Sequence, residues 1–516
     1  MFNIKIFIQN NRHKLLLIII LILGAFLRLY DLGAESLWYD EVASIDQALE
    51  DFPTLFSGFH ISPLYFLFLK YWIMFFGVSE FALRLPSAIF GILSIISLYV
   101  IGSQLFNKKV AIISSFILAI SPFHIFYSQE TRNYNLFVFL TLLSMVYFVR
   151  IIKEKCPSVR LFILYVITNI FLLYSMLFGL FVIVIQNIFY FSLNIKKKNK
   201  WIITQIFILL VYLIWFIPFV IFLFNEKAYV SQCIDWIPLP SLFSIVKLFE
   251  SFSYKGHCFG GWDFFVNTKD IGFSWLLLYI YGIFFIIGIV FSKKNEIKYV
   301  VLSLLWLFIP ITVVYLFSYL CFPLFVIRYF IFASPAYYIL IAKGIERINI
   351  SLYQIAAIIL ISLLIFPSIY FYYTKNMKID WKKAIPYIDQ NMRENDLILI
   401  TIPDKVLMFN YYGKDGAKYQ NKKNIKIDVR RKLGIDMLRG GYVWNYRNHE
   451  LWGAYNAKQI KEIISKKGNK IDGNLWLILV TRWTQNAKEI TNCIESFLER
   501  KSEKKYEGLN IYYYIK

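Results

Sequence analysis

Long apolar runs recur from near the N-terminus to residue 373, and they constrain the fold of this chain more than any other feature. About eleven of them approach the length of roughly 20 residues that a helix needs to cross a bilayer. They are 15–30, 85–106, 110–127, 134–150, 161–178, 179–194, 201–223, 272–291, 299–320, 330–342 and 350–373. Inside a bilayer the backbone must satisfy its own hydrogen bonds, so these runs are expected to be helices. With 58% hydrophobic residues, the chain is predicted to be a polytopic α-helical membrane protein rather than a soluble domain.

Lysines and arginines fall between these runs in a regular order. Every second connection holds a basic cluster: the N-terminus, Lys108-Lys109, 150–160, 196–200, 293–298 and 343–347. Because basic connections stay in the cytoplasm, the alternation predicts about eleven spans in the plasma (inner) membrane, with a cytoplasmic N-terminus and an extracytoplasmic C-terminus. The first run has no small-residue cleavage site and is expected to be a retained span. These clusters account for much of the net charge of +22, so nucleic acid is not expected as a partner.

One apolar segment, Pro63 to Gly77, does not fit the series of spans. It is short and has Lys70 in its middle. If it crossed the bilayer, every later basic cluster would fall outside the cell, against the positive-inside rule. We therefore expect 41–56 and 62–77 to be helices that lie along the outer membrane surface.

The composition changes after Thr374. Residues 375–516 are rich in lysine and contain no run long enough to span a bilayer. We therefore divide the chain into a transmembrane domain, 1–374, and a soluble extracytoplasmic α/β domain, 375–516. The predicted elements of the latter are a helix at 380–393, strands at 396–402 and 475–481, a helix at 486–500 and a strand at 509–515. Its basic surface would suit an anionic headgroup or glycolipid, or it is simply solvated.

Two adjacent acids, Asp40 and Glu41, follow the first predicted span in the stretch LGAESLWYDEVAS. An aspartate at this position could simply cap the amphipathic helix that is predicted to begin near Glu41. The functional alternative is a carboxylate held at the membrane surface by Trp38 and Tyr39. There it could accept a proton from an attacking hydroxyl or amine.

A second acid, Glu130, stands at the outer end of the third predicted span. It could converge with the first pair on one cavity, or it could form a salt bridge with Arg132 in a polar turn. Basic side chains at span ends could hold a phosphate, or they could anchor the spans in the headgroup layer. The stronger candidates are Arg84, Arg132 and Arg328, and the weaker ones are Arg28 and Lys70.

Metal and nucleotide signals are sparse. His60 and His257 are expected to face outward and could join a carboxylate in a divalent metal site, although a single exposed histidine is often merely polar. Cys233 and Cys258 share a loop and could pair, but no cysteine spacing is typical of zinc. The sequence contains no P-loop and no GxGxxG after a strand. The outer side of the membrane also lacks nucleotide donors. A transfer reaction there would therefore need a lipid-linked donor.

At these residues the chain resembles the polytopic GT-C glycosyltransferases related to protein O-mannosyltransferases and to the aminoarabinose transferase of lipid A. The resemblance covers about residues 25–380. It rests on segments whose order and spacing are similar: 32–44, 63–69, 77–88, 121–134 and 328–335, followed by DWKKA at 380–384. One departure is HISPLY at 60–65, where relatives often have HPPLY, so His60 is displaced by one residue.

The resemblance implies an enzyme that moves a sugar from a polyprenyl-phosphate carrier, with inversion, to a lipid, glycan or protein acceptor at the outer membrane face. It implies that Asp40 is the catalytic base, with Glu41 beside it in the motif, and that Glu130 is the acid of the second loop. Basic positions of matching motifs, where the donor phosphate would bind, are Arg84, Arg132 and Arg328 with Tyr329. No cofactor is implied with certainty beyond the metal considered above.

Three other functions are compatible with such a chain. One is a ligase or polymerase that acts on a lipid-linked oligosaccharide, and another is a transporter of lipid-linked glycan. A transporter should place ionisable residues at mid-membrane depth, whereas here the acids and arginines of interest lie at the outer ends of spans. The third, a scaffold without catalytic activity, predicts that Asp40→Asn changes nothing.

Overall fold

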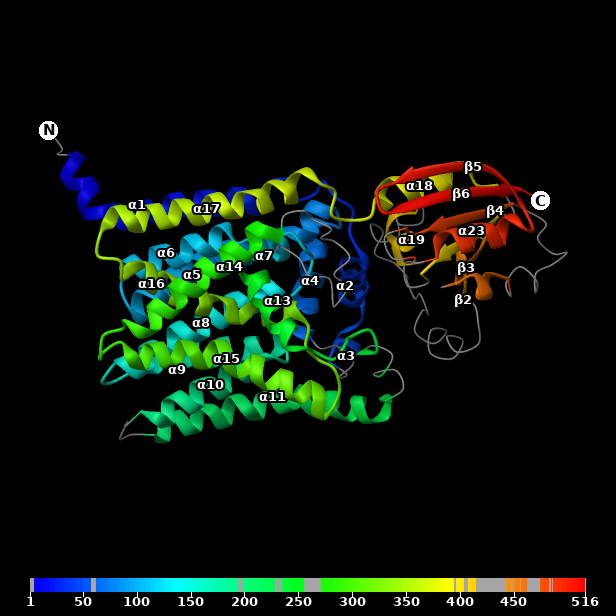
Figure 1. Ribbon diagram of the computed structural model, residues 1–516. Coiled ribbons are helices and arrows are strands. Elements are labelled where there is room, and N and C mark those ends of the chain that lie inside the picture. Colours follow the sequence, from blue (N-terminus) through cyan, green and yellow to red (C-terminus); the bar gives the residue numbers. More distant parts are fainter. Residues whose placement is uncertain are drawn as a thin grey trace. The chain divides into compact units, whose positions relative to one another are not determined.

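The computed structural model describes residues 4–515 apart from several gaps. These gaps are 57–61, 194–197, 228–230, 232–233, 255–270, 394–395, 403–406, 414–441, 447–448, 455, 462–473, 482–483 and 485. The chain divides into two compact units (Figure 1). The first comprises Met1–Leu32, Ala48–Tyr71 and Arg84–Thr374, and the second comprises Gly33–Gln47, Trp72–Leu83 and Lys375–Lys516. Two short segments from early in the chain thus belong with the C-terminal residues.

The first unit is built from helices, as the apolar runs predict. They are α1 (Ile4–Leu29), α5 (Glu80–Leu105), α6 (Lys108–Ile120), α7 (Pro122–Ser128), α8 (Tyr134–Lys153), α9 (Val159–Ser175), α10 (Gly179–Ser192), α11 (Asn199–Asn225), α13 (Leu242–Ser253), α14 (Ile271–Val290), α15 (Ile297–Leu320), the 3₁₀ helix η1 (Ile327–Ala333), α16 (Ser334–Glu346) and α17 (Ser351–Thr374). The predicted class of a polytopic α-helical membrane protein with a small C-terminal sheet is confirmed.

Length and hydropathy mark a subset of these helices as spans. Among the described residues, five are long and apolar enough to cross a membrane, namely α5, α8, α11, α15 and α17. The pair α6 and α7, bent by 60°, makes a sixth if it is counted as one span. The apolar helices α9, α10 and α14 are shorter. The total of about eleven spans therefore stays a prediction.

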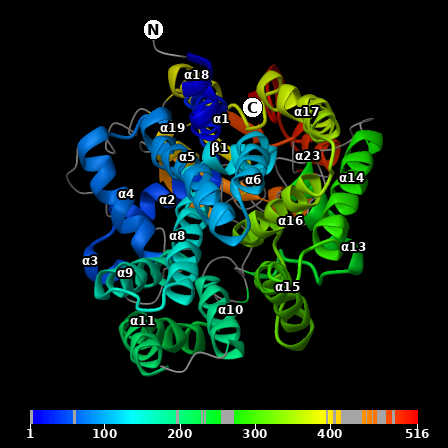
Figure 2. The same cartoon turned by 90° about the vertical axis from the view of Figure 1, so that its left-hand side faces the viewer.

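Burial separates the central helices of the bundle from those at its edge. In α8, 72% of the apolar window is buried, against 22% in α11 and 17% in α17. Figure 2 shows α11 at the periphery of the helices. A helix that is apolar all around and mostly uncovered by protein is suited to contact with lipid.

Helices α14 and α16 cross at a pair of glycines. A Cβ added to Gly288 would overlap the carbonyl oxygen of Leu340, and a Cβ added to Gly344 would overlap that of Phe284. Small residues let two helix backbones approach closely, which is a common way to pack helices where no hydrophobic effect drives them together.

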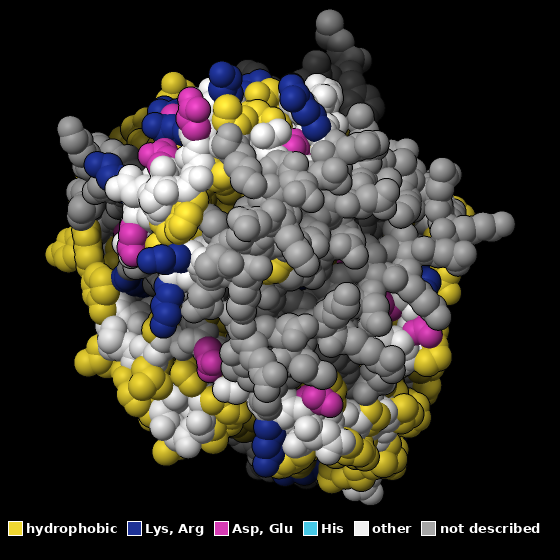
Figure 3. Space-filling model, turned by 90° about the vertical axis from the view of Figure 1, so that its right-hand side faces the viewer, with side chains coloured by type: hydrophobic (Ala, Val, Ile, Leu, Met, Phe, Trp, Pro, Cys, Tyr) yellow, Lys and Arg dark blue, Asp and Glu magenta, His cyan; other side chains and the backbone are white. Residues whose placement is uncertain are grey.

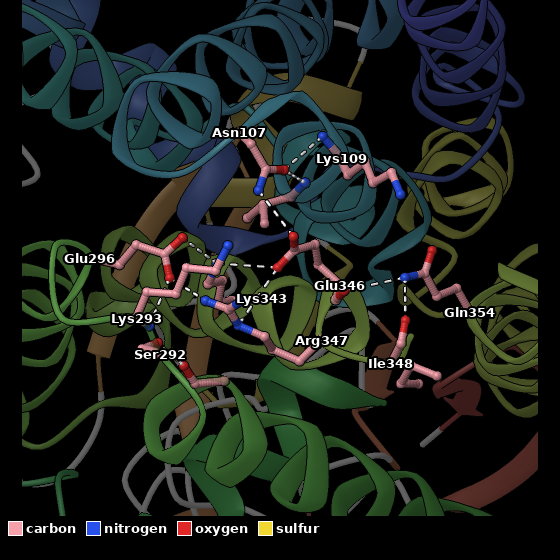
Figure 4. Close-up of polar contacts among 12 residues, drawn as sticks. Asn107, Lys109, Ser292, Lys293, Glu296, Lys343, Glu346, Arg347, Ile348 and Gln354 are labelled. Carbon is pink, nitrogen blue, oxygen red and sulfur yellow. Dashed lines mark hydrogen bonds and ion pairs between the residues drawn. The ribbon is translucent and has the colours of Figure 1, made fainter. Parts of the chain in front are cut away.

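Charged side chains join the ends of three helices (Figure 4). Lys343 near the end of α16 is fully buried, with its Nζ 3.0 Å from Glu296 Oε1 and 3.1 Å from Glu346 Oε2. Arg347 also pairs with Glu296. Asn107, which caps α6, donates from Nδ2 to Glu346 Oε1 at 3.2 Å. Two of the predicted basic clusters, 293–298 and 343–347, are therefore tied together by ion pairs.

The segments predicted at 41–56 and 62–77 are helical. They form α2 (Tyr39–Leu49), α3 (Phe52–Leu55) and α4 (Pro63–Phe76). The helix α2 ends at Leu49, and a new helix, α3, begins after Asp51. Asp51 caps α3 by accepting a hydrogen bond from Thr54 N at 3.2 Å. Their orientation along the membrane surface stays a prediction.

A six-stranded sheet forms the core of the second unit. It contains β1 (Leu397–Thr401), β2 (Tyr442–Tyr446), β3 (His449–Ala454), β4 (Leu475–Leu479), β5 (Glu499–Tyr506) and β6 (Leu509–Ile515), in the order β2-β3-β1-β4-β6-β5. β1 pairs in parallel with β3 and β4, and the other pairs are antiparallel.

Helices lie on both faces of this sheet. α23 (Ala487–Glu495) buries Ile490 and Ile494 against Leu477 of β4. On the opposite face, α18 (Trp381–Asn391) brings Tyr387 to 6.2 Å from the ring of Trp476. A further short helix, α19 (Leu407–Tyr412), precedes β2. The face drawn in Figure 3 shows basic and acidic side chains of described residues interspersed rather than gathered by sign.

The strand and helix predictions for this unit were correct in part. The helix at 380–393 and the strands at 396–402, 475–481 and 509–515 correspond to α18, β1, β4 and β6. The predicted helix at 486–500 is too long. The observed helix, α23, ends at Glu495, and β5 begins at Glu499. The strand β5 was not predicted because its sequence, ERKSEKKY, does not alternate apolar and polar residues. An exposed strand at the edge of a sheet does not need this alternation.

Candidate active site

Asp40 and Glu41 form the first turn of α2, where acidic side chains are favoured by the helix dipole. The Glu41 carboxylate turns back and accepts a hydrogen bond from Trp38 N at 3.1 Å. The Ser44 hydroxyl donates to the Asp40 carbonyl at 2.7 Å. Glu41 is fully buried, whereas Asp40 is only partly buried. Of the two neighbouring acids, Asp40 is therefore the one that solvent can reach.

Glu41 is engaged in an ion pair within the second unit. Its Oε2 lies 2.8 Å from Lys378 Nζ, and the two side chains are 0% and 4% exposed. The pair is therefore shielded from water. Lys378 precedes α18 and was not singled out from the sequence, because a lone lysine in a lysine-rich stretch gives no signal.

The loop before Asp40 makes further hydrogen bonds within this unit. Ser36 Oγ accepts from Lys382 N at 3.1 Å, and Leu37 N donates to the Tyr412 hydroxyl at 2.6 Å. Glu35 accepts a hydrogen bond from Met377 N. The residues that lead into α2 are thus held by side chains and backbone from α18, α19 and the segment before α18.

Glu130 belongs to the first unit, in the tight turn between α7 and α8. Its side chain is fully buried. Arg132 N donates to the Glu130 carbonyl at 2.8 Å, and the Arg132 guanidinium lies 5.7 Å from the ring centroid of Tyr134. The Ser87 hydroxyl of α5 donates to the Arg132 carbonyl at 3.1 Å. The turn that holds Glu130 and Arg132 is thereby attached to the same end of α5 that holds Arg84.

Arg84 and Arg28 are both buried and bonded to backbone carbonyls. Arg84 Nη1 donates to Leu32 O at 3.0 Å. Arg28 donates to the end of α6, at 3.0 Å to Ala119 O and 3.1 Å to Leu118 O. Arg28 thereby bonds to carbonyls at the end of α6, where the bend into α7 interrupts the helical hydrogen bonds. Lys70 donates to Glu50 O.

Arg328 and Tyr329 lie in η1, the short helix before α16. The Arg328 guanidinium is 5.3 Å from the ring centroid of Trp236 and 5.6 Å from that of Tyr329. Its side chain is largely buried. An arginine between two aromatic rings keeps a fixed orientation, which suits it to hold an anionic group.

Neither predicted metal-binding histidine falls within the described part of the chain, since His60 and His257 lie in two of its gaps. The same holds for the pairing considered for Cys233 and Cys258. Elsewhere, in the part of the chain that the structure does describe, no three His, Cys, Asp or Glu side chains gather in a way that could hold a metal ion.

Comparison with solved structures identifies the fold. ArnT from Cupriavidus metallidurans in the apo state superposes with a TM-score of 0.57, 10% sequence identity, and coverage of 96% of this chain and 97% of that chain. The protein has the GT-C fold. The same ArnT bound to undecaprenyl phosphate matches with a TM-score of 0.56 and 10% identity over 98% of both chains.

A second GT-C protein matches over a smaller share of its length. The archaeal oligosaccharyltransferase AglB from Archaeoglobus fulgidus, in complex with an inhibitory peptide and a dolichol-phosphate, has a TM-score of 0.50 and 13% identity. The match covers 78% of this chain and 64% of AglB, so the chain spans less than two thirds of that protein.

The sequence itself matches a family model within the helical unit. The model for dolichyl-phosphate-mannose-protein mannosyltransferase matches residues 60–222. No curated protein matches the chain in sequence. The predicted resemblance to GT-C glycosyltransferases related to protein O-mannosyltransferases and ArnT is thereby confirmed.

Several residues that organise this GT-C protein had not been assigned a role from the sequence. Besides Lys378, they include Gln129, whose Nε2 donates to Tyr30 O at 2.8 Å and to Arg28 O at 3.2 Å. Gln129 lies directly before Glu130 in the SQETRNY stretch, and its amide satisfies carbonyls at the end of α1. The motif marked the right segment, but an amide that bonds to a distant backbone has no recognisable sequence pattern.

Proposed function

We propose that the protein is a membrane glycosyltransferase that moves a sugar from a polyprenyl-phosphate carrier to a lipid, glycan or protein acceptor. The GT-C fold over nearly the whole chain supports this reaction. Among proteins of the same fold, ArnT has been seen with undecaprenyl phosphate and AglB with a dolichol-phosphate and a peptide. The observation that carries the proposal is Asp40 itself, partly exposed at the start of α2 beside a neighbour that is buried in an ion pair.

In the proposed reaction Asp40 is the general base. An acceptor hydroxyl or amine attacks the anomeric carbon of the donor sugar and gives its proton to the Asp40 carboxylate. The bond from the anomeric carbon to the phosphate oxygen breaks, and its electron pair leaves with the polyprenyl phosphate. Attack from the side opposite to the phosphate inverts the anomeric centre. A base in this role typically contributes about 10²–10⁴-fold to the rate.

The leaving group explains why the proposed reaction also needs arginines. A departing phosphate is a stable anion and needs no general acid, but fixed positive charge stabilises it as it forms. We propose this role for Arg132 and Arg328 with Tyr329. We propose that Arg84, in α5, adds positive charge for the departing phosphate while its guanidinium donates a hydrogen bond to Leu32 O. Glu130, fully buried beside Arg132 in sequence, is proposed to fix this turn.

The same proposal includes a place in the cell. A donor on a lipid carrier and the alternation of basic connections suggest a plasma-membrane enzyme with the C-terminal residues 375–516 outside. The acceptor then lies in the cell envelope. Transfer of a whole oligosaccharide is the second candidate, favoured by the match to AglB.

Mass spectrometry of cell-envelope glycans and glycolipids tests the proposal and separates the two candidates. Cells that lack the protein should lose an envelope species whose extra mass is one sugar, and cells that produce the Asp40→Asn variant should not regain it. A missing mass of several sugars supports the oligosaccharide transferase instead. An envelope that is identical with and without the protein overturns both.

A further inference from the structure

The loop that leads to Asp40 is part of the same compact unit as the C-terminal residues. Along this loop, successive residues bond to positions more than 300 residues away in the sequence. Ser36 accepts from Lys382 N, Leu37 N donates to Tyr412, and Glu41 pairs with Lys378. A C-terminal domain that served only to recognise an acceptor would not need these hydrogen bonds and this ion pair with the loop that carries Asp40.

The ion pair between Glu41 and Lys378 joins two oppositely charged side chains. Nζ and Oε2 are 2.8 Å apart and both side chains are almost completely buried. The same Oε2 also accepts the hydrogen bond from Trp38 N at 3.1 Å. A buried charge is unfavourable unless its partner is well placed. The pair therefore restricts the first turn of α2, and Asp40 is the preceding residue of that turn.

The two residues that follow Lys378 in the sequence, Ile379 and Asp380, contact the sheet of the second unit. Asp380 N donates to Glu507 O at 3.1 Å, in the turn between β5 and β6. Gly508 in this turn has a positive φ of 76°, and a Cβ at that position would lie 2.9 Å from Ile379 Cγ1. The glycine is therefore needed both for the turn and for the close approach of Ile379. The β5–β6 turn thus contacts Ile379 and Asp380, the neighbouring Lys378 pairs with Glu41, and Glu41 directly follows Asp40 in the chain.

We propose that Lys378 is a positioning residue and that, through Glu41, the C-terminal domain orients the carboxylate of Asp40 for catalysis. This inference rests on the proposed function, because it assumes that Asp40 is the base. It assigns Glu41 to orientation of the base rather than to contact with the substrate. It also makes the sheet of the second unit a part of the catalytic machinery.

The experiment compares variants of the full-length protein reconstituted in lipid nanodiscs. Two quantities are measured: the rate of sugar transfer, with the donor and acceptor identified by the envelope comparison, and the affinity for undecaprenyl phosphate. A shift of about 1 Å in a catalytic group costs on the order of 10²-fold in rate. We expect Lys378→Met to lower the transfer rate by about 10–100-fold, with the affinity for undecaprenyl phosphate unchanged. Lys383→Met is the matched control, because Lys383 is 71% exposed and pairs only one turn away with Asp380; its transfer rate should be normal.

Two further variants keep the test valid if Lys378→Met fails to fold. The double variant Glu41→Gln/Lys378→Met removes both buried charges, so its thermal unfolding midpoint should return towards the wild-type value while transfer stays low. Lys378→Arg keeps the charge and should restore part of the transfer rate.

Recovery of the wild-type rate together with stability in the double variant would show that the pair is merely structural and would overturn the inference. So would a normal rate for folded Lys378→Met. Asp40→Asn, assayed alongside, separates this failure from that of the proposed function. If Asp40→Asn also transfers sugar normally, the assignment of the base is wrong as well.

Discussion

Tyr372, in the last turn of α17, donates its hydroxyl hydrogen to Gln129 Oε1 at 2.6 Å. The amide nitrogen of the same glutamine donates to carbonyls at the end of α1. One side chain thus joins the ends of α1, α7 and α17. Gln129 is almost fully buried, so its loss would remove all of these hydrogen bonds at a site that water reaches poorly.

Replacing Gln129 with methionine should therefore destabilise the helical unit. Loss of a partner that leaves a buried polar group unsatisfied costs about 1–3 kcal/mol. The thermal unfolding midpoint of the purified protein in detergent should fall, and Tyr372→Phe should lower it by a smaller amount. Tyr370→Phe is the control, since Tyr370 is 60% exposed on the same helix. Equal midpoints for Tyr372→Phe and Tyr370→Phe would contradict a stabilising role for this hydrogen bond.

A methyl group at the crossing of α14 and α16 should also destabilise the protein. Gly344→Ala places its Cβ against the carbonyl oxygen of Phe284, and backbone cannot move aside as a side chain can. Overpacking of this kind typically costs about 1–3 kcal/mol. Gly282→Ala, in α14, meets no atom within 4 Å, so its unfolding midpoint should be unchanged or higher. If both alanine variants unfold at the same temperature, the inference that α14 and α16 approach closely at Gly344 is wrong.

The charge cluster at the helix ends should make stability depend on pH in acid. Burial alone would raise the pKa of Glu296, but the hydrogen bond and charge of Lys343, with Arg347, hold that pKa below its usual value of 4.5. A carboxyl whose pKa is lower in the folded state stabilises the fold above its unfolded pKa, and this contribution is lost as pH falls through the folded value.

Stability should therefore decline as the pH falls below about 4.5, and Glu296→Gln should lose part of this decline. At neutral pH the variant should be destabilised by about 1.5–3 kcal/mol, the range for a hydrogen bond to a charged group. Unfolding midpoints measured between neutral and acidic pH check both statements. A Glu296→Gln protein with the wild-type midpoint at every pH would show that the pair contributes nothing.

The alternation of basic connections predicts that the C-terminus lies outside the cell. Alkaline phosphatase fused after Lys516 should be active, because it folds only after export, while a fluorescent protein that matures only in the cytoplasm should stay dark. The reverse pattern would require one span more or fewer than predicted.

The helices of the first unit could be read from the sequence because each is a long apolar segment, and lipid leaves such a segment no other structure. The bend at Ser121, between α6 and α7, was not foreseen, since the apolar run continues through it. Pro122 begins α7 there and the Ser121 side chain caps it. Hydropathy reports whether a segment suits lipid, but not where its helix axis turns.

The candidate site was predictable only as far as its motifs. Asp40 and Glu130 could be selected as candidates because they are acids beside predicted spans, where charge is costly. The distinction between Asp40 and Glu41 required the structure, because only the contact with Lys378 shows that Glu41 is buried. The strand β5 could not be predicted for a related reason. Its exposed, charged residues show no apolar pattern, and only its pairing with β6 in the structure identifies it as a strand.

The most direct test of the account is the rate at which purified protein releases polyprenyl phosphate from its donor in the presence of acceptor. Asp31→Asn is a suitable control, because Asp31 is exposed and has a positive φ of 58° that asparagine also tolerates. Asp40→Asn should fold and bind undecaprenyl phosphate normally but release product at least about 10²-fold more slowly than wild type, while Asp31→Asn keeps its rate. Turnover by Asp40→Asn at the wild-type rate would contradict the assignment of Asp40 as the base.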